Sequence, residues 1–285
     1  MISIIILHLN KVDYSRRCLE SLFSTAGVEF EIVTVDNGST DGTAEYLLAF
    51  RRLAAERGVP VTVVLNDHNA GAAGARNQAL QLCRGSEIAC IDNDIVVRDR
   101  GWLARLRETL YGDERTALAT PKLLFPFPPY HIEHIGVAIS PNGRVGYLGR
   151  GAERDDPQFA ARCELQNTTS ACVLLKRSVL DEIGHFDETF DPAQFEDLDL
   201  FYRMKAHGYR LIYEPSVEMY HFENVTTDGS TQLKFKYLTI KHGIEFKRRW
   251  QHLFTAEAGP EDDALRWEEL PRLRIDEIGE LEMRA

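Results

Sequence analysis

The sequence predicts an α/β fold built on a mostly parallel β-sheet. Short apolar runs alternate with helix-like segments through residues 1–98, and this alternation is typical of parallel sheets with right-handed crossover connections. A polar cluster follows each of the first four apolar runs, at the strand ends beyond which such sheets bind ligands. The 285 residues are 44% hydrophobic and 27% charged, as in a soluble globular protein.

The predicted strands of the first half are continuous apolar runs. Ile2–Leu9 is the first of them, as expected for a strand that is covered on both faces. The other predicted strands are Glu31–Val35, Val61–Leu65 and Glu87–Ile91. Helices are predicted between them at Tyr14–Ser24, Thr43–Arg57 and Ala73–Leu82. The order of elements is therefore β-α-β-α-β-α-β.

After Asp99 the pattern changes, which predicts a second half of mixed α/β character packed on the first. A helix at Gly101–Tyr111 precedes a proline-rich stretch, Pro121–His131. The later predictions are strands at Ile135–Ile139, Arg144–Leu148 and Ser170–Arg177, a polar loop at Gly151–Arg162, and a helix at Phe195–Tyr209. We expect one domain at 1–228, formed by halves 1–98 and 99–228, followed by a helical extension at 229–285.

Charge and cysteine content restrict the class of protein. The net charge of −11 argues against a nucleic-acid binder, because phosphate backbones select basic surfaces. It leaves open a phosphorylated small molecule bound together with a metal ion. The five cysteines form no CxxC pair, which predicts reduced thiols in a cytosolic protein. The apolar N-terminal run lacks a basic leader region and is too short to cross a bilayer.

Asp92 and Asp94 form a D-x-D pair where the fourth predicted strand ends. If the backbone stays extended across Asn93, both carboxylates point to the same side. Two carboxylates that close repel one another unless a cation lies between them, and Mg²⁺ or Mn²⁺ prefers such oxygen ligands. A solvated loop is the alternative interpretation, and the position at a strand end favours metal binding.

Three carboxylates lie in the first turn of the predicted helix 195–209: Glu196, Asp197 and Asp199. They could complement the helix dipole, or one of them could face a cleft as a general base. The local pattern leaves both interpretations open. His221 follows a short predicted strand. It is either a packed histidine or, if the fold brings it to the D-x-D pair, a metal ligand.

The order of the motifs resembles that of the family 2 glycosyltransferases, which have the GT-A fold. It is most similar to the bacterial rhamnosyltransferase-type and O-antigen-type enzymes, over about residues 1–225. The motifs are Asn10, VDNGSTDGT, NAGAAGARN, IDNDIVV, TSACVLLKRSVLDEIGHFDETF, FEDLDLFYRMKAHGYRLIYEP and VEMYH. The resemblance implies a Rossmann-like sheet with a nucleotide-sugar-binding half and a mixed acceptor-binding half. It also implies inverting, metal-dependent sugar transfer from a nucleotide-diphosphate donor, UDP- or dTDP-linked, to an acceptor hydroxyl.

The resemblance also implies roles for particular residues. Asp36 would contact the base or ribose, Asp41 would shape the same loop, and Arg76 would lie against the base or diphosphate. Asn10, Asn37, Asn69 and Asn93 complete the donor-binding set. Asp94 would be the main ligand of Mn²⁺ or Mg²⁺, joined by Asp92 and His221, while Asp197 would be the catalytic base. The segment LHLN departs from the family's first loop and leaves His8 and Leu9 without an assigned role.

The second half would meet the acceptor, which is a saccharide, a lipid-linked sugar or a protein. Candidate acceptor contacts are Glu133, His134, Asn167 and Glu196. The segment 232–254 is a basic helix with interleaved aromatic residues. It could lie on an anionic membrane, or dock on the domain through Leu238, Ile244 and Trp250. We expect a cytoplasmic protein, or one peripheral to the inner face of the membrane, with an acidic tail at 255–285 that is mobile or pairs with this helix.

Two other classes of function remain open at this point. A metal-dependent phosphatase or nucleotidyltransferase would also use D-x-D carboxylates, but it would release phosphate or pyrophosphate instead of an intact nucleoside diphosphate. A nucleotide-binding scaffold without catalysis is the other alternative.

Overall fold

A computed structural model of the chain describes residues 1–223, 225, 235–265 and 270–284. The first half forms one parallel sheet with the strand order β4-β1-β2-β3. Its strands are β1 (Ile2–His8), β2 (Phe30–Asp36), β3 (Val61–Leu65) and β4 (Glu87–Asp92), and its helices are α1 (Val12–Ser21), α2 (Thr43–Glu56) and α3 (Ala72–Leu82). The predicted β-α-β-α-β-α-β order is confirmed.

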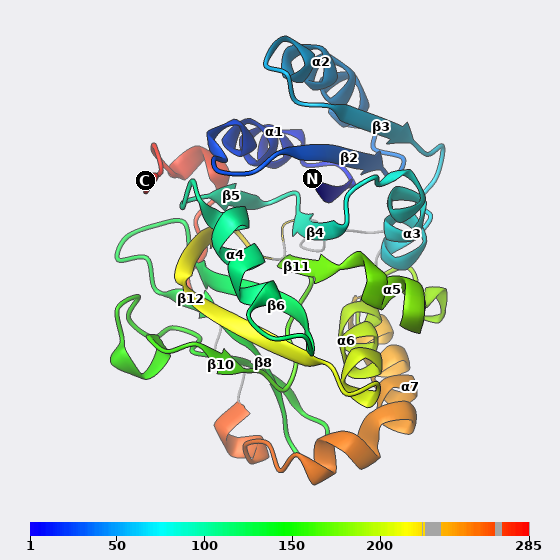
Figure 1. Cartoon of the computed structure of the whole chain (residues 1–285), viewed down its shortest axis with the longest axis vertical. Coiled ribbons are helices and arrows are strands. Elements are labelled where there is room, and N and C mark those ends of the chain that lie inside the picture. The colour runs from blue at the N-terminus through cyan, green and yellow to red at the C-terminus, as the bar shows by residue number, and fades with distance from the viewer. Residues whose placement is uncertain (224, 226–234, 266–269, 285) are drawn as a thin grey trace.

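The second half continues the same sheet in mixed directions (Figure 1). Beyond β4 come β11, β6, β12 and β10; β11 runs antiparallel to both β4 and β6, whereas β12 runs parallel to β6. Short β5 pairs with the end of β12, and β7 pairs with β6. The bounds are β5 (Ile95–Val97), β6 (Thr116–Leu124), β7 (Ile132–His134), β10 (Cys163–Glu164), β11 (Cys172–Lys176) and β12 (Arg210–His221).

Two long strands of this half contain prolines, and the sequence did not predict them at their true length. Pro121 lies in the wholly buried β6, where a proline-rich stretch was expected, and Pro215 lies inside the twelve-residue β12, where the expected strand was short. The pairing of β12 with β6 shifts register between Glu214 and Glu218, beside Pro121. Because proline lacks an N–H donor, it is tolerated in a sheet at such a bulge.

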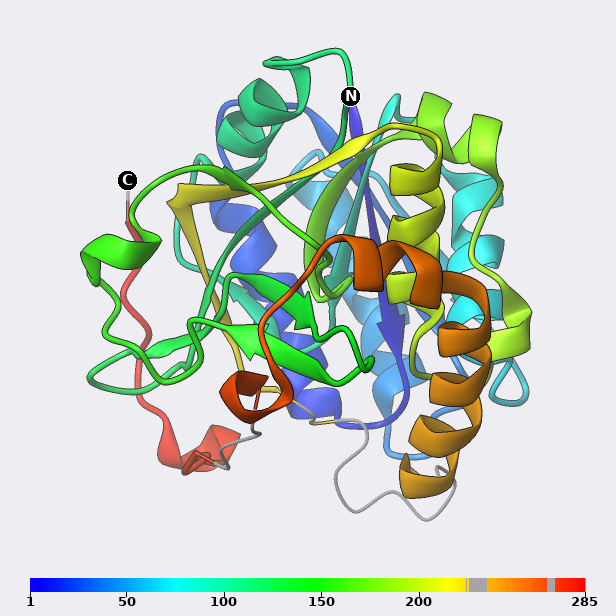
Figure 2. The same ribbon diagram turned by 90° about the horizontal axis from the view of Figure 1, so that it is seen from below.

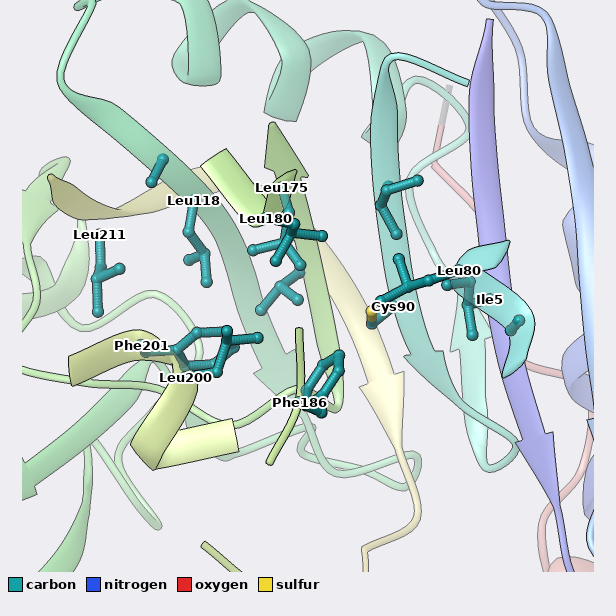
Figure 3. Packing of buried hydrophobic residues seen from close by; sticks show 14 of the residues in the cluster. Ile5, Leu80, Cys90, Leu118, Leu175, Leu180, Phe186, Leu200, Phe201 and Leu211 are labelled. Carbon is teal, nitrogen blue, oxygen red and sulfur yellow. The ribbon is translucent and has the colours of Figure 1, made fainter. Parts of the chain in front are cut away.

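Helices cover both faces of the sheet. On the β1 strand, Ile4 and Ile6 pack with residues of α1, α2 and α4 (Trp102–Tyr111), whereas Ile5 packs with residues of α3, α5 (Arg177–Ile183) and α6 (Glu196–Ala206). Figure 3 shows the second of these layers, where Leu80 of α3 and Phe201 of α6 meet the strands. Successive strand residues face opposite sides, so a continuous apolar run is what a doubly covered strand requires.

The hairpin of β8 (Gly136–Ile139) and β9 (Val145–Leu148) and the helix α7 (Phe235–Ala256) form a third packed group with α6. Figures 1 and 2 both show α7 beside α6. Phe246 and Trp250 contact Tyr202 of α6, and Leu238 is buried. Ile244 is 66% exposed, which corrects its predicted role in docking: it lies two residues from Phe246, and so on the opposite side of the helix. Residues 232–234 of the predicted helix lie outside the described residues.

The last described stretch of the C-terminal tail, residues 275–284, returns to the first half, whereas Glu257 and Asp262 contact Lys205 and Ser140 of the second half. The carbonyls of Ile278 and Gly279 accept hydrogen bonds from Arg17 of α1, and the backbone of Arg284 pairs with Asp99. In Figure 1 this end of the chain lies beside α1, on the far side of the molecule from α7. Among described residues, no salt bridge joins this tail to a lysine or arginine of α7. The pKa of Asp262 is lowered first by its Ser140 hydrogen bond and more weakly by the nearby Lys247 charge, so the expected pairing with the basic helix is limited to this electrostatic contact.

Across the described residues, the structure contains no helix with the length and apolar character that a bilayer crossing demands. All five cysteines are free thiols. Four of them are buried, and Cys163 is exposed.

Candidate functional site

A cavity of about 480 Å³ opens where the carboxyl ends of β1 and β4 meet the second half. Its wall on the first half includes His8, Arg76 and Asp92, and its wall on the second half includes Tyr147, Asp197 and His221. The ends of parallel strands therefore form the binding region, as the topology predicts.

The D-x-D pair reaches this cavity through a turn. β4 ends at Asp92, Asn93 and Asp94 form the turn, and β5 begins at Ile95. The expectation of an extended backbone across Asn93 is therefore wrong. The physical cause is the antiparallel pairing of β5 with β12, which places Ile95 opposite His221. The same pairing holds the carbonyl of Asp94 3.2 Å from the backbone N of Phe222.

Asp92, Asp94 and His221 together could hold a metal ion. One ligand atom from each lies within 4.8 Å of the others, and Asp94 Oδ1 is 3.4 Å from His221 Nε2. Although burial opposes the charged imidazolium, the carboxylates of Asp94 and Glu133 raise the pKa of His221 well above its ordinary value. That shift indicates a concentrated negative potential. Two carboxylates and an imidazole fit a divalent ion such as Mn²⁺, and the carboxylates also suit Mg²⁺.

Arg76 links α3 to the start of α6 across the cavity. Its Nη1 lies 2.7 Å from Glu196 Oε1, and its Nη2 lies 3.4 Å from Asp92 Oδ1. Burial would lower the pKa of Arg76, but these two carboxylates raise it above its ordinary value. The guanidinium is therefore a permanent positive charge in the wall, next to the candidate metal ligands.

Asp197 of the α6 first turn faces the cavity, and two backbone N–H groups fix its carboxylate. Its Oδ2 accepts a hydrogen bond from the backbone N of Ser170 at 3.0 Å, and its Oδ1 accepts one from the backbone N of Leu198 at 2.7 Å. Burial, and then the Glu196 carboxylate, raise the pKa of Asp197 to about 7. Asp199 instead bonds Arg203, Arg249 and Trp250 in the packing of α7. Asp197 thus combines the two interpretations of this turn, since it accepts a hydrogen bond from an N–H of the helix start and also faces the cavity.

The predicted donor-binding residues divide into two groups. Asn37, Asn69, Arg76, Asp92 and Asn93 line the cavity. Asn10, Asp36 and Asp41 are not in its wall and shape the loops behind it. Asp36 Oδ2 accepts from the backbone N of Ser39 at 3.1 Å, Asn10 Oδ1 accepts from the backbone N of Thr40 at 2.8 Å, and Asp41 Oδ1 accepts from the backbone N of Thr43 at 3.2 Å.

Three of the four predicted acceptor contacts lie behind the cavity. Glu133 and Asn167 are fully buried, His134 is 1% exposed, and none of the three lines the cavity. The Asn167 amide donates to the carbonyl of Leu198 at 3.1 Å, so it supports the start of α6. The structure thus corrects the expectation that these side chains meet an acceptor. Glu196 does line the cavity, paired with Arg76.

Several lining residues had no role in the sequence-based prediction. Glu223, two residues after His221, has a φ of 64° and a carboxylate paired with both terminal nitrogens of Arg150, at 2.9 and 3.0 Å. The backbone N–H of Ser170 holds Asp197, and Thr239 of α7 donates to Gln194 at 2.8 Å on the cavity wall. The acid beside His221 was a usable signal for Glu223. Backbone donors and contacts between distant segments leave no signal in the residue pattern.

His8 is also in the wall. Its Nδ1 lies 2.8 Å from Ser15 Oγ, and burial lowers the pKa of His8 to about 3, so the ring is neutral.

Comparison with known proteins identifies the family of this chain. The model described as Glycosyl transferase family 2 matches residues 3–184. The chain is 27% identical over 258 residues to the uncharacterized protein y4gI of Sinorhizobium fredii, and 29% identical over 235 residues to the O-antigen biosynthesis protein RfbC of Myxococcus xanthus. These alignments cover 88% and 79% of this chain, but only 28% and 17% of the two relatives. The chain therefore spans less than a third of either relative.

One shorter relative matches over most of its length. The Escherichia coli protein WfaP is named as a UDP-Glc:alpha-D-GlcNAc-diphosphoundecaprenol beta-1,3-glucosyltransferase. It is 25% identical over 244 residues, which cover 86% of this chain and 85% of WfaP. Among solved structures, that of GalNAc-T7 with UDP, GalNAc and Mn²⁺ superposes with a TM-score of 0.71 at 17% identity. It covers 89% of this chain and 48% of the GalNAc-T7 chain.

The geometry predicts a divalent-cation site that depends on Asp94 and His221. Changing either residue to alanine removes a ligand, so we expect the Kd for Mn²⁺ to rise at least about tenfold. Isothermal titration of the full chain with Mn²⁺ measures this. Asp67→Ala is the matched control, because Asp67 is an exposed carboxylate and its loss makes the same charge change as that of Asp94. Unchanged Mn²⁺ affinity in both ligand variants would contradict the assignment.

Proposed function

The chain belongs to glycosyl transferase family 2, and we propose that it transfers a sugar from a nucleoside-diphosphate donor to an acceptor hydroxyl with inversion at the anomeric carbon. Its fold is the GT-A fold of its structural relatives. The observation that carries the proposal is the meeting of two groups in one cavity. The cluster of Asp92, Asp94 and His221 lines the same cavity as the half-buried carboxylate of Asp197.

The donor would bind between the first half and the D-x-D turn. Asn69 would offer its amide group there to a base or ribose, and Arg76 offers positive charge for a diphosphate. Asn37 and Asn93 also line the cavity, but their amides bond Gly71 and Ser15, so they would shape the wall. Asp36 and Asp41 would act through the loop that they hold. We propose a UDP- or dTDP-sugar as the donor. WfaP is named for a UDP-sugar and the GalNAc-T7 structure was solved with UDP, which supports the first of these.

Asp94, Asp92 and His221 would hold a divalent metal ion, Mn²⁺ or Mg²⁺. Bound there, the ion would act as a Lewis acid that offsets the negative charge of the leaving nucleoside diphosphate. The GalNAc-T7 structure was solved with Mn²⁺, which supports this metal as the first ion to test. The remaining chemistry would fall to residues of this chain.

Asp197 would accept the proton of the acceptor hydroxyl. As that proton leaves, the hydroxyl oxygen forms a bond to the anomeric carbon, and the bond from this carbon to the donor phosphate oxygen breaks. The two backbone N–H groups on Asp197 leave its carboxylate in one orientation, which is what a positioned base requires. Arg76 lies near the start of α6 and adds positive charge on the donor side of the cavity.

We also propose that the acceptor is lipid-linked and that α7 meets an anionic membrane. Tyr237, Ile240 and Ile244 are 63%, 64% and 66% exposed and share one face of α7. Lys241 and Arg248 are exposed beside them. Apolar side chains flanked by basic residues are typical of helices that lie on membranes, and the anionic leaflet is the cytoplasmic one. Thr239 of the same helix contacts the cavity wall, so docking would bring the cavity to the bilayer.

Removing the proposed base is the direct test of catalysis. Asp197→Asn keeps the shape of the side chain but cannot take a proton, so we expect kcat to fall by about 10²-fold or more. Equilibrium binding of UDP with Mn²⁺ should stay within about twofold of wild type, because Asp197 lies on the acceptor side. Turnover of a UDP- or dTDP-sugar measures the first quantity, and near-normal turnover by the variant would exclude Asp197 as the base.

The pH dependence follows from the same residue. Asp197 must be ionised to accept a proton, and its pKa is raised to about 7, so kcat/KM should fall as the pH drops below that value. The negative charge of Glu196 raises the pKa of Asp197, so removing it in Glu196→Gln should lower that pKa. The positive charge of Arg76, which lowers the pKa of Asp197, remains in this variant. The acid limb should therefore move to lower pH in this variant. Initial rates between about pH 5 and 9 measure this shift. An acid limb at the same pH in wild type and Glu196→Gln would contradict the claim that the Glu196 charge raises the pKa of Asp197.

Membrane contact is tested by flotation with vesicles. We expect the full chain to float with phosphatidylglycerol-containing vesicles and to stay behind with pure phosphatidylcholine. Ile240→Ser/Ile244→Ser should lose this binding, whereas Leu53→Ser/Leu82→Ser, at exposed leucines of α2 and α3, should keep it. Equal flotation of both double variants would overturn the proposal. The proposal would also be overturned if sedimentation showed that the wild-type chain is a dimer and that the Ile240→Ser/Ile244→Ser variant is a monomer, because this face of α7 would then be a dimer interface.

A further inference from the structure

One buried carboxylate lies directly behind the imidazole of His221. Glu133 Oε2 is 3.2 Å from His221 Nδ1, while Nε2 on the opposite side of the ring is 3.4 Å from Asp94 Oδ1. Glu133 is fully buried and is absent from the cavity wall. Its side chain therefore faces the histidine and not a substrate.

The chain places Glu133 there through an irregular strand pair. In the antiparallel pairing of β7 with β6, His134 is opposite Leu123 and Ile132 is opposite Leu124. Glu133 is therefore an extra residue of β7 without a partner on β6. Such a bulge changes the direction of a side chain and is over-represented next to active sites.

Two further side chains, the buried imidazole of His134 and the guanidinium of Arg150, lie against the Glu133 carboxylate. His134 Nε2 is 3.4 Å from Oε2, and Arg150 Nη1 is 3.7 Å from Oε1. Arg150 is in turn fixed by its two-pronged contact with Glu223. Burial alone would raise the pKa of Glu133, but His134, His221 and Arg150 lower it below its ordinary value.

The geometry indicates the tautomer: Glu133 Oε2 lies 3.2 Å from Nδ1 of His221, its Oε1 lies beside the Arg150 guanidinium, and a carboxylate in such a position accepts hydrogen bonds. The proton between Glu133 and His221 therefore belongs to Nδ1 of the histidine. In the neutral ring this assignment leaves the lone pair on Nε2, the nitrogen that points to Asp94. Metal-binding histidines usually have such a partner on the other ring nitrogen, and its loss typically costs 10–100-fold in metal affinity.

We propose that Glu133 is a positioning residue for the metal site, which orients His221 and selects the tautomer that presents Nε2 to the ion. The inference rests on the proposed function, since it presupposes that Asp92, Asp94 and His221 hold a divalent cation. It assigns to Glu133 a contact with His221 in place of the predicted contact with an acceptor.

Metal binding by the full chain tests this role without any turnover. We expect Glu133→Ala to raise the Kd for Mn²⁺ by about 10–100-fold in isothermal titration. Glu133→Gln should raise this Kd by a smaller factor, because its amide oxygen can still accept a hydrogen bond from Nδ1 of His221. Co²⁺ provides a second measurement, since its visible absorption reports the ligand set. The Glu133→Ala spectrum should move toward that of His221→Ala.

Glu218→Ala is the matched control. Glu218 is also buried, at 3% exposure, and its Oε2 is 2.9 Å from Arg98 Nε, but it contacts none of Asp92, Asp94 and His221. It should lose thermal stability as Glu133→Ala does, while keeping its Mn²⁺ affinity. An equal loss of affinity in both variants would assign the effect to general destabilisation and overturn the inference.

The outcomes separate this inference from the proposed function. If the wild-type chain binds no Mn²⁺ or Co²⁺, the metal site itself fails. If the wild type binds and a folded Glu133→Ala binds equally well, only the role of Glu133 fails. Should Glu133→Ala not fold, Glu133→Met decides, because its side chain has a similar length but no oxygen that accepts from Nδ1: a wild-type Kd together with a wild-type Co²⁺ spectrum would overturn the inference.

Discussion

The candidate site depends on one strand pairing, the antiparallel contact of β5 with the end of β12. Asp92 and Asp94 belong to the first half of the chain and His221 to the second, more than a hundred residues later. The register that sets Ile95 opposite His221 joins them. The sheet itself is continuous through β11, which pairs with both β4 and β6, and the β5–β12 contact makes a second link between the two halves at the cavity end. The cavity exists where these two parts of the sheet meet.

The charge arrangement around the cavity explains why so many carboxylates can be buried together. Each has a cationic or N–H partner: Arg76 for Glu196 and Asp92, Arg150 for Glu223 and Glu133, and two backbone N–H groups for Asp197. Unpaired, a buried charge is strongly disfavoured. Asp92, Asp94 and His221 lie close together, each with a ligand atom within 4.8 Å of the others, and this acidic cluster is the part of the cavity suited to a cation. Asp197 is not part of this cluster, and its carboxylate is held instead by two backbone N–H groups.

Much of the fold and part of the site could be predicted from the residues. Apolar runs such as Ile2–His8 and the D-x-D pair at a strand end indicated the parallel sheet and its binding edge. The second half was harder to predict, because Pro121 and Pro215 interrupt the pattern of strands that the structure accommodates at a bulge. Glu133 and Asn167 were predicted as surface contacts because polar residues are mostly exposed. Only their buried partners, His221 and the carbonyl of Leu198, account for their true positions.

The sequence by itself determined the α/β class, the order of the first-half elements and the residue types that a sugar-transfer site needs. These are local properties, since periodicity and strand-end chemistry act over a few neighbouring positions. The tertiary structure alone decided that Asp94 meets His221, that Asp197 and not Asp199 faces the cavity, and that Ile244 of α7 faces outward. Such placements depend on register and packing between segments far apart in the chain, and no local pattern carries that information.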